Sequence, residues 1–194
     1  MLLDDDILES YPKEAVLKDG VSCQLRPLLQ SDEKAFHDFF LAIPEPERMF
    51  IKHRVEDPEV IREWCEKIDY GRNFPMLALI GEQVIGCATL HQQLGGWKRH
   101  IGRVSALVHP EFRARGLARA MVEDVLDVAR HCGLQRVEAE FLSEQERAIK
   151  VFGLFGFRSL VHLPGYVKDM QANTHDYVLM GMNLKTDEEY AGMG

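Results

Sequence analysis

The chain has 194 residues, of which 46% are hydrophobic and 28% are charged. This composition suits one folded domain and excludes a disordered protein. The formal net charge of −8 disfavours nucleic acid and anionic membranes as partners, and no apolar run reaches the roughly 20 residues of a membrane span.

The first residues, "MLLDDDILES", are acidic where a signal peptide needs a basic start, so we expect a cytoplasmic protein. We expect residues 1–19 to form an extension with a weak helix, residues 20–186 to form the domain, and residues 187–194 to form a flexible acidic tail. The four cysteines are scattered and form no CxxC pair. This spacing argues against a metal site and predicts buried free thiols.

The pattern from residue 21 to residue 68 predicts a strand followed by two helices. The segment "VSCQLRPLL" (21–29) alternates as a strand does. Ser31 and Asp32 can cap a helix that "IPEPE" breaks, and "DPEVIREWCEKI" (57–68) begins a second helix with Pro58 in its first turn.

In the next stretch the spacing of apolar residues changes from a helical to a strand-like period. Segments 76–80 and 84–90 read as a hairpin that turns at Gly81-Glu82, and "IGRVSALV" (101–108) is a third strand. Apolar residues then recur at helical spacing from Leu117 to Cys132, and Gly133 is a natural residue to end that helix.

The last part of the domain alternates strands with one helix. "RVEAEFL" (136–142) is a strand, and residues 143–155 are a helix with Ser143 and Glu146 as a capping box. Segments 156–163 and 176–184 are strands. The element order predicts an α/β (α+β) fold around one mixed sheet, in which strands 101–108 and 136–142 are parallel with a right-handed crossover.

The stretch "VHPEFRARGLARAM" (108–121) places arginines around a glycine at the start of a helix. Segment 97–119 holds six lysines and arginines against one glutamate, a local charge of +5 that leaves −13 on the rest of the chain. A helix N-terminus presents unpaired backbone N–H groups, which bind phosphate readily. The stretch therefore predicts an anion site, although a solvated strand-to-helix turn would read the same way.

The string V-x-P-x-x-R-x-x-G-L-A, from Val108 to Ala118, resembles the acyl-CoA-binding motif of the GNAT N-acetyltransferase superfamily. A second motif, from Ala148 to Gly156-Phe157, and the closing hairpin from "GYVKD" (165–169) to "DYVLMGMNL" are also similar to that family. The resemblance implies a mostly antiparallel sheet of about six to seven strands flanked by about four helices. It also implies a splayed parallel strand pair that holds CoA.

The resemblance implies acetyl-CoA or a related acyl-CoA as co-substrate, no metal, an amine acceptor and, from the family alone, a homodimer. Backbone N–H groups of the loop would hold the pyrophosphate, and strand Ala106 to Val108 would bond the pantetheine arm. The expected CoA-binding residues are Ala106, Leu107, Val108, Arg113, Ala114, Arg115, Gly116, Leu117, Ala118, Arg119, Gln145 and Phe152.

Amine acylation needs a group that takes the amine proton. Glu140 and Glu138 lie two apart on one strand and point to the same face. Glu140 is nearer the strand's C-terminal end and is favoured, while His100 is a third candidate. Either carboxylate could instead lie on a solvated strand face or pair with Arg136 or Arg158.

Two positions depart from the family pattern. The family often has Asn where this chain has Gln145, and its general-acid Tyr aligns with Phe152, which has no proton to give. Tyr166 or Tyr177 could supply a hydroxyl instead, although a Tyr in a strand is usually a packing residue.

The acceptor site is expected in the first two helices, in "RMFIKHRV" (48–55) and in "GYVKD", where aromatic and basic residues mix. The residues concerned are Phe50, His53, Arg54, Tyr70, Trp97 and Tyr166. The sequence thus predicts an N-acetyltransferase that moves an acetyl or acyl group to a primary amine of a small molecule or protein. The alternatives are a catalytically weak CoA-binding regulatory module and a binder of another nucleotide phosphate.

Overall fold

The computed structural model describes residues 5–48, 51, 53–169 and 171–184. The helices are α1 (Asp5–Glu9), α2 (Glu33–Ala42), α3 (Glu45–Arg48), α4 (Pro58–Glu66), α5 (Leu117–His131) and α6 (Glu146–Leu154). The strands are β1 (Lys13–Val16), β2 (Ser22–Pro27), β3 (Asn73–Ile80), β4 (Gln83–His91), β5 (Ile101–Val108), β6 (Arg136–Leu142), β7 (Arg158–Lys168) and β8 (Thr174–Asn183). The expected tail at 187–194 lies outside the described residues.

The described strands form one sheet in the order β1-β2-β3-β4-β5-β6-β8-β7. Neighbours are antiparallel except β5 and β6, which are parallel and joined through α5. The mixed α/β fold with a mostly antiparallel sheet is therefore confirmed, with eight strands among the described residues where six to seven were expected. No helix in the described part of the chain is long and apolar enough to cross a membrane.

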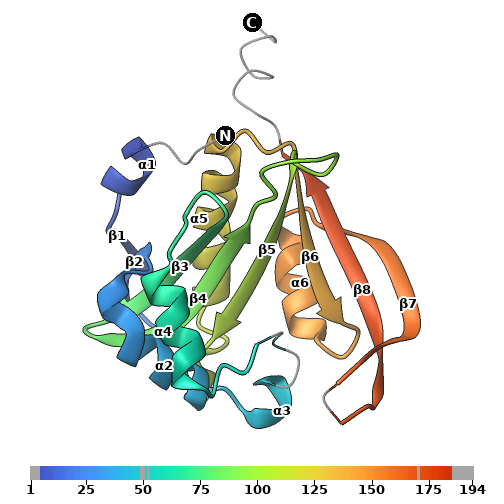
Figure 1. The fold of residues 1–194 in the computed structure, drawn as a ribbon, viewed down its shortest axis with the longest axis horizontal. Coiled ribbons are helices and arrows are strands. Elements are labelled where there is room, and N and C mark those ends of the chain that lie inside the picture. The colour runs from blue at the N-terminus through green and yellow to red at the C-terminus, as the bar shows by residue number, and fades with distance from the viewer. Residues whose placement is uncertain (1–4, 49–50, 52, 170, 185–194) are drawn as a thin grey trace, which may run out of the picture.

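Helices cover both faces of the sheet (Figure 1). Alternate residues of β6, namely Val137, Ala139 and Phe141, are buried in one apolar cluster with residues of α5 and α6. We call this side the α5 face. On the opposite side, the α2 face, α2 and α4 pack over a second cluster that includes Leu77 and Leu79 of β3.

The N-terminal segment is built into the fold. The weak helix is present as α1, but Lys13–Val16 form an edge strand against β2. Buried Asp124 of α5 accepts hydrogen bonds from the Tyr11 hydroxyl and the Lys13 ammonium. A buried carboxylate requires such partners, so these contacts fix the segment to α5.

The predicted cap of α6 was wrong, whereas the predicted end of α2 is confirmed. Ser143 does not cap α6: the helix begins at Glu146, its cap residue is Gln145, and the Gln145 side-chain oxygen accepts from the N–H of Leu142 at 2.9 Å. The segment "IPEPE" does end α2, but it also contains the start of the short helix α3. The four cysteines are buried free thiols, as expected, and burial raises the pKa of Cys87 to about 12.

Candidate functional site

The parallel strands β5 and β6 pair over only three positions, Ile101, Gly102 and Arg103 with Arg136, Val137 and Glu138. Beyond Arg103 and Glu138 the two strands separate, and Figure 1 shows them diverging toward the end where α3 lies. The backbone of Val104 to Val108 is paired with β4 on one side and has no β6 partner on the other. A gap bordered by strand edges is suited to bond an extended ligand arm.

The loop after β5 turns the chain sharply into α5. A short 3₁₀ turn, Pro110–Phe112, is followed by Ala114 at φ 63° and Gly116 at φ 87°. Positive φ is uncommon for a residue with a side chain, so Ala114 is held in a strained conformation. Residues of positive φ can bring successive N–H groups together, and these two directly precede the N-terminus of a 15-residue helix. This geometry is suited to bind an anion.

Two loop arginines already have carboxylate partners. Arg113 binds Glu47 of α3 through both terminal nitrogens, at 2.9 and 2.8 Å, and donates its Nε to the Val108 carbonyl. Arg115 pairs with Asp19 at 3.0 Å and lies over the Phe112 ring. Sequence reasoning missed both acidic partners because each lies far from the loop in the chain.

The third arginine of the stretch, Arg119, is exposed on α5. Among the described residues it forms no ion pair that meets a 4.0 Å limit. Among the described residues, the loop thus combines two positive-φ residues and a helix N-terminus with one unpaired cation and two paired cations.

Glu140 lies at the first α2-face position of β6 after the strands separate. Its carboxylate pairs with Arg103 at 3.2 Å and accepts a hydrogen bond from the Tyr177 hydroxyl at 3.0 Å. The sequence suggested Arg136 or Arg158 as an ion-pair partner, whereas the structure supplies Arg103 from the neighbouring strand. Burial and the Glu140 carboxylate raise the pKa of Tyr177 to about 12, so this phenol is neutral near pH 7.

Glu138 shares a face with Glu140, as the spacing predicted, but occupies the last paired position. It lies 4.0 Å from the Lys98 ammonium, and its side chain is 14% exposed. His100 immediately precedes β5, at the end of the strand opposite the loop. An eight-residue strand spans about 25 Å, so the fold does not bring His100 together with the loop.

Tyr166 and Phe152 occupy contrasting environments. Tyr166 on β7 is 67% exposed, and its ring centre lies 5.9 Å from that of Tyr177. Phe152 on α6 is buried, and its ring packs edge-on against Phe141 and Phe157 at 5.0 Å each. A hydroxyl therefore reaches the α2 face from the closing hairpin, whereas position 152 contributes only packing.

The residues suggested for the acceptor site lie in different environments. The Tyr70 hydroxyl donates to the Leu28 carbonyl and its ring packs on Phe74, which is a structural role. The His53 ring packs on Trp64 of α4. Trp97 is 87% exposed on the loop before β5. Phe50 lies outside the described residues.

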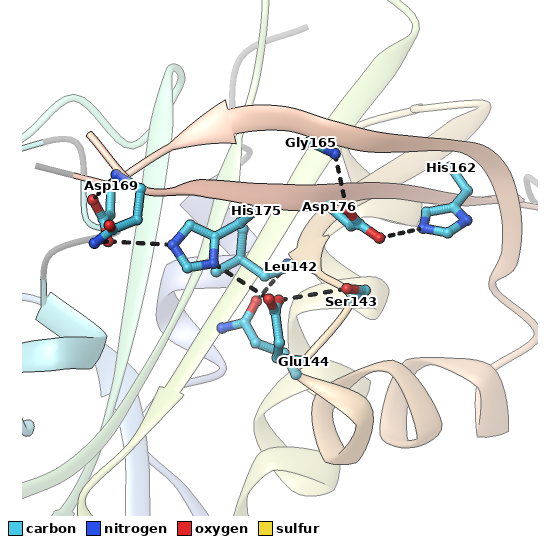
Figure 2. Close-up of polar contacts among 10 residues, drawn as sticks. Leu142, Ser143, Glu144, His162, Gly165, Asp169, His175 and Asp176 are labelled. Atoms are coloured by element: carbon cyan, nitrogen blue, oxygen red, sulfur yellow. Dashed lines mark hydrogen bonds and ion pairs between the residues drawn. The ribbon is translucent and has the colours of Figure 1, made fainter. Parts of the chain in front are cut away.

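A polar cluster ties the closing hairpin to the loop before α6, and Figure 2 shows its geometry. The His175 ring lies between Asp169, at 3.2 Å, and Glu144, at 3.3 Å. Hydrogen bonds to these two carboxylates raise the pKa of His175. No group of three or more His, Cys, Asp or Glu side chains in the described part of the chain is arranged to hold a metal ion.

Solved structures with the same fold cover most of the chain. The GNAT domain of a Streptomyces lividans protein called PAT aligns with a TM-score of 0.74 at 20% identity, over 89% of this chain and 97% of that one. The protein yncA of Salmonella typhimurium, solved with its cofactor acetyl-CoA, aligns with a TM-score of 0.71 at 19% identity, over 84% and 94%.

A curated relative and a family model add sequence similarity. The L-amino acid N-acyltransferase MnaT of Escherichia coli is 27% identical over 84 residues, which are 41% of this chain and 49% of the relative, so the match spans about half of that protein. The model of the acetyltransferase (GNAT) family matches residues 34–157, which include the loop, the β5–β6 gap and α6. The chain belongs to the acetyltransferase (GNAT) family.

Proposed function

We propose that this protein is an acyl-CoA-dependent N-acyltransferase that moves an acetyl group from acetyl-CoA to a primary amine in a ternary complex. The observation that carries the proposal is the gap between β5 and β6, with the positive-φ loop and the N-terminus of α5 at one end and Glu140 at its edge. Family membership and a curated relative named as an N-acyltransferase support the same reaction class.

The donor would be held mainly by backbone groups. The N–H groups of Arg113 to Ala118 would bind the CoA pyrophosphate at the N-terminus of α5. The free edge of β5, from Ala106 to Val108, would bond the pantetheine arm and direct the thioester into the gap. Arg119 supplies positive charge nearby, and Arg113 and Arg115 can do so after exchanging a carboxylate for a phosphate.

The acceptor would approach from the α2 face. Its neutral nitrogen attacks the thioester carbonyl carbon, the C–N bond forms, and the nitrogen's proton passes to Glu140 directly or through water. A backbone N–H of β5 near Leu107 or Val108 stabilises the oxyanion. The C–S bond then breaks, and the CoA thiolate takes up a proton.

Arg103 and Tyr177 would position Glu140 for this step. Arg103 holds the carboxylate from β5, and Tyr177 donates a hydrogen bond from β8. Tyr177 is also the hydroxyl nearest the proposed base, so it can return a proton to the thiolate in place of the missing Tyr at position 152. We place the reaction in the cytoplasm, where the four buried thiols would stay reduced.

Release of free CoA from acetyl-CoA, measured over a broad panel of primary amines, tests the proposal. We expect amine-dependent release that the Glu140→Gln variant loses. Absence of release with every amine, from a folded protein that binds acetyl-CoA, would contradict catalysis.

That result would favour the second candidate, a CoA-binding regulatory module without catalysis, which the buried Phe152 motivates. A Phe152→Tyr variant distinguishes the two. Because position 152 is enclosed by Phe141 and Phe157, we expect the new hydroxyl to lower the free energy of unfolding by about 1–3 kcal/mol without raising kcat. A gain in turnover would instead show that the missing hydroxyl limits the reaction.

A further inference from the structure

A cavity of about 220 Å³ lies on the sheet beside Glu138. His91 of β4, Arg103 of β5 and Glu138 of β6 occupy one register row across its floor, and Lys98 borders it from the loop before β5. These side chains lie on the same sheet face as Glu140. The cavity is therefore one row away from the proposed base.

The polar groups of the cavity favour an anion. Two cations, Lys98 and Arg103, border it with one carboxylate, Glu138, while Glu140, the other partner of Arg103, lies outside the lining. Lys98 is only loosely engaged, because its ammonium lies 4.0 Å from Glu138 and its side chain is 51% exposed. A second anion can approach Lys98 without breaking a close hydrogen bond.

Arg103 gives the more specific indication. One of its terminal nitrogens pairs with Glu140, but its Nε is buried and has no hydrogen-bond partner among the described residues. Buried donors in folded proteins almost always have an acceptor, and leaving one unpaired is costly. The hydrogen bonding of Arg103 is thus incomplete, and an oxygen-bearing anion would satisfy this donor once the side chain turns toward the cavity.

Spacing connects the cavity to the reaction. Glu138 and Glu140 are two residues apart on β6, which corresponds to about 7 Å along the strand. A single small molecule can therefore place an amine at Glu140 and an acidic group at Lys98 and Arg103. We propose that the acceptor is an amine that also carries an anionic oxygen group, a carboxylate in the first place, and that Lys98 and Arg103 select it. This inference rests on the proposed acyl transfer.

Matched acceptors test the selection directly. We expect kcat/KM for amino acids to exceed that for the corresponding amino acid amides by about tenfold or more, because an ion-paired hydrogen bond is lost in the amide. Aminoalkylphosphonates in the same assay distinguish a carboxylate site from a phosphate site. Equal kcat/KM for acids, amides and phosphonates would overturn the inference.

The Lys98→Gln variant locates the effect, since Arg103 also holds Glu140 and cannot be changed alone. We expect the acid-to-amide ratio of kcat/KM to fall about tenfold, mainly through KM. Arg130→Gln is the matched control, because it removes the same charge from α5 and leaves the cavity intact. An unchanged ratio in Lys98→Gln would contradict the assignment.

A binding measurement separates this inference from the proposed function. Trp97 adjoins Lys98 and is exposed, so its fluorescence can report titration with an N-acetyl amino acid or with its amide. We expect tighter binding of the acid, weakened in Lys98→Gln, with the signal lost in Trp97→Phe. If no amine is acylated, the proposed function fails, and this titration alone decides the cavity: preference for the acid supports it, and equal binding contradicts it.

Discussion

The loop between β5 and α5 and the α2-face cluster around Glu140 are built in different ways. The loop uses backbone N–H groups of consecutive residues, oriented by Ala114 and Gly116 and by the start of one helix. The Glu140 cluster uses side chains from three strands, brought together by Arg103 and Tyr177. The first construction suits the proposed donor, whose pyrophosphate is constant, and the second suits the proposed acceptor.

The largest expected effect comes from Gly116→Glu in the loop. Gly116 has φ 87°, and a glutamate side chain there would contact Lys18 and place a negative charge at the proposed pyrophosphate site. Acetyl-CoA at about a hundred times its Kd should stabilise the wild type by about 2.7 kcal/mol, which raises Tm by several degrees. We expect Gly116→Glu to show no such rise.

Gly133→Glu is the control for strain and charge. Gly133 also has positive φ, 68°, but lies beyond the opposite end of α5. We expect a lower Tm that still rises with acetyl-CoA. Equal responses of the two variants to acetyl-CoA would show that the loop does not hold the donor.

The second-largest expected effect comes from a change in the Glu140 cluster. Glu140→Gln keeps the shape of the side chain but removes the proposed base, so kcat should fall by about 10²–10³-fold. Acetyl-CoA binding, measured by calorimetry, should stay at the wild-type value because Glu140 does not touch the loop. This separation between binding and turnover is the property that distinguishes the two regions.

Two further variants, with a smaller expected fall of kcat, test the role of Glu140. Tyr177→Phe leaves the carboxylate but removes one hydrogen bond and the proposed proton donor, so we expect kcat to fall by about tenfold or more. Glu138→Gln changes a carboxylate one row away, where the strands are still paired, and should lower kcat by less than Glu140→Gln. A larger fall of kcat in Glu138→Gln than in Glu140→Gln would assign the role of base to Glu138 instead of Glu140.

A smaller effect tests whether the loop arginines assist the backbone. Glu47→Gln weakens the bidentate ion pair between Glu47 and Arg113, which frees the Arg113 guanidinium for phosphate. We expect acetyl-CoA to bind about two- to fivefold tighter, a modest gain because exposed ion pairs are weak. Weaker binding would mean that the contact between α3 and the loop supports the donor site.

The smallest effect concerns the hairpin that carries Tyr177. The pKa of His175 is raised by its hydrogen bonds to Asp169 and Glu144, so the imidazolium is favoured in the folded state. Its contribution to stability is complete below the unfolded-state pKa of about 6.5 and is lost as pH rises through the raised folded-state pKa. The Tm difference between wild type and His175→Gln should therefore shrink as pH rises from 6 to 9, as a series of thermal melts can show. A constant difference would exclude a charged His175.

Sequence and structure agree where the signal is local. The bounds of β5 and β6 were predicted from their apolar patterns, and Pro110, Gly116 and the stripe of α5 indicated the loop. The edge strand β1 was missed because its four residues carry too little pattern to stand out from an extension. The sequence of residues 97–119 shows the local positive charge but not the acidic residues that pair with it.

Those partners depend on tertiary contacts. Glu47 is 66 positions from Arg113, Asp19 is 96 from Arg115, and Tyr177 is 37 from Glu140. No spacing rule connects such residues, because they meet only when the sheet assembles. For the same reason the sequence left several residues open as the base, and the structure brings Glu140, Arg103 and Tyr177 together.

The most direct test of a donor loop that is separate from a catalytic face is to measure acetyl-CoA Kd and kcat on the same two variants. This separation predicts that Gly116→Glu loses acetyl-CoA binding, while Glu140→Gln binds acetyl-CoA like the wild type and loses turnover. Wild-type acetyl-CoA affinity in Gly116→Glu, or wild-type kcat in Glu140→Gln, would contradict it.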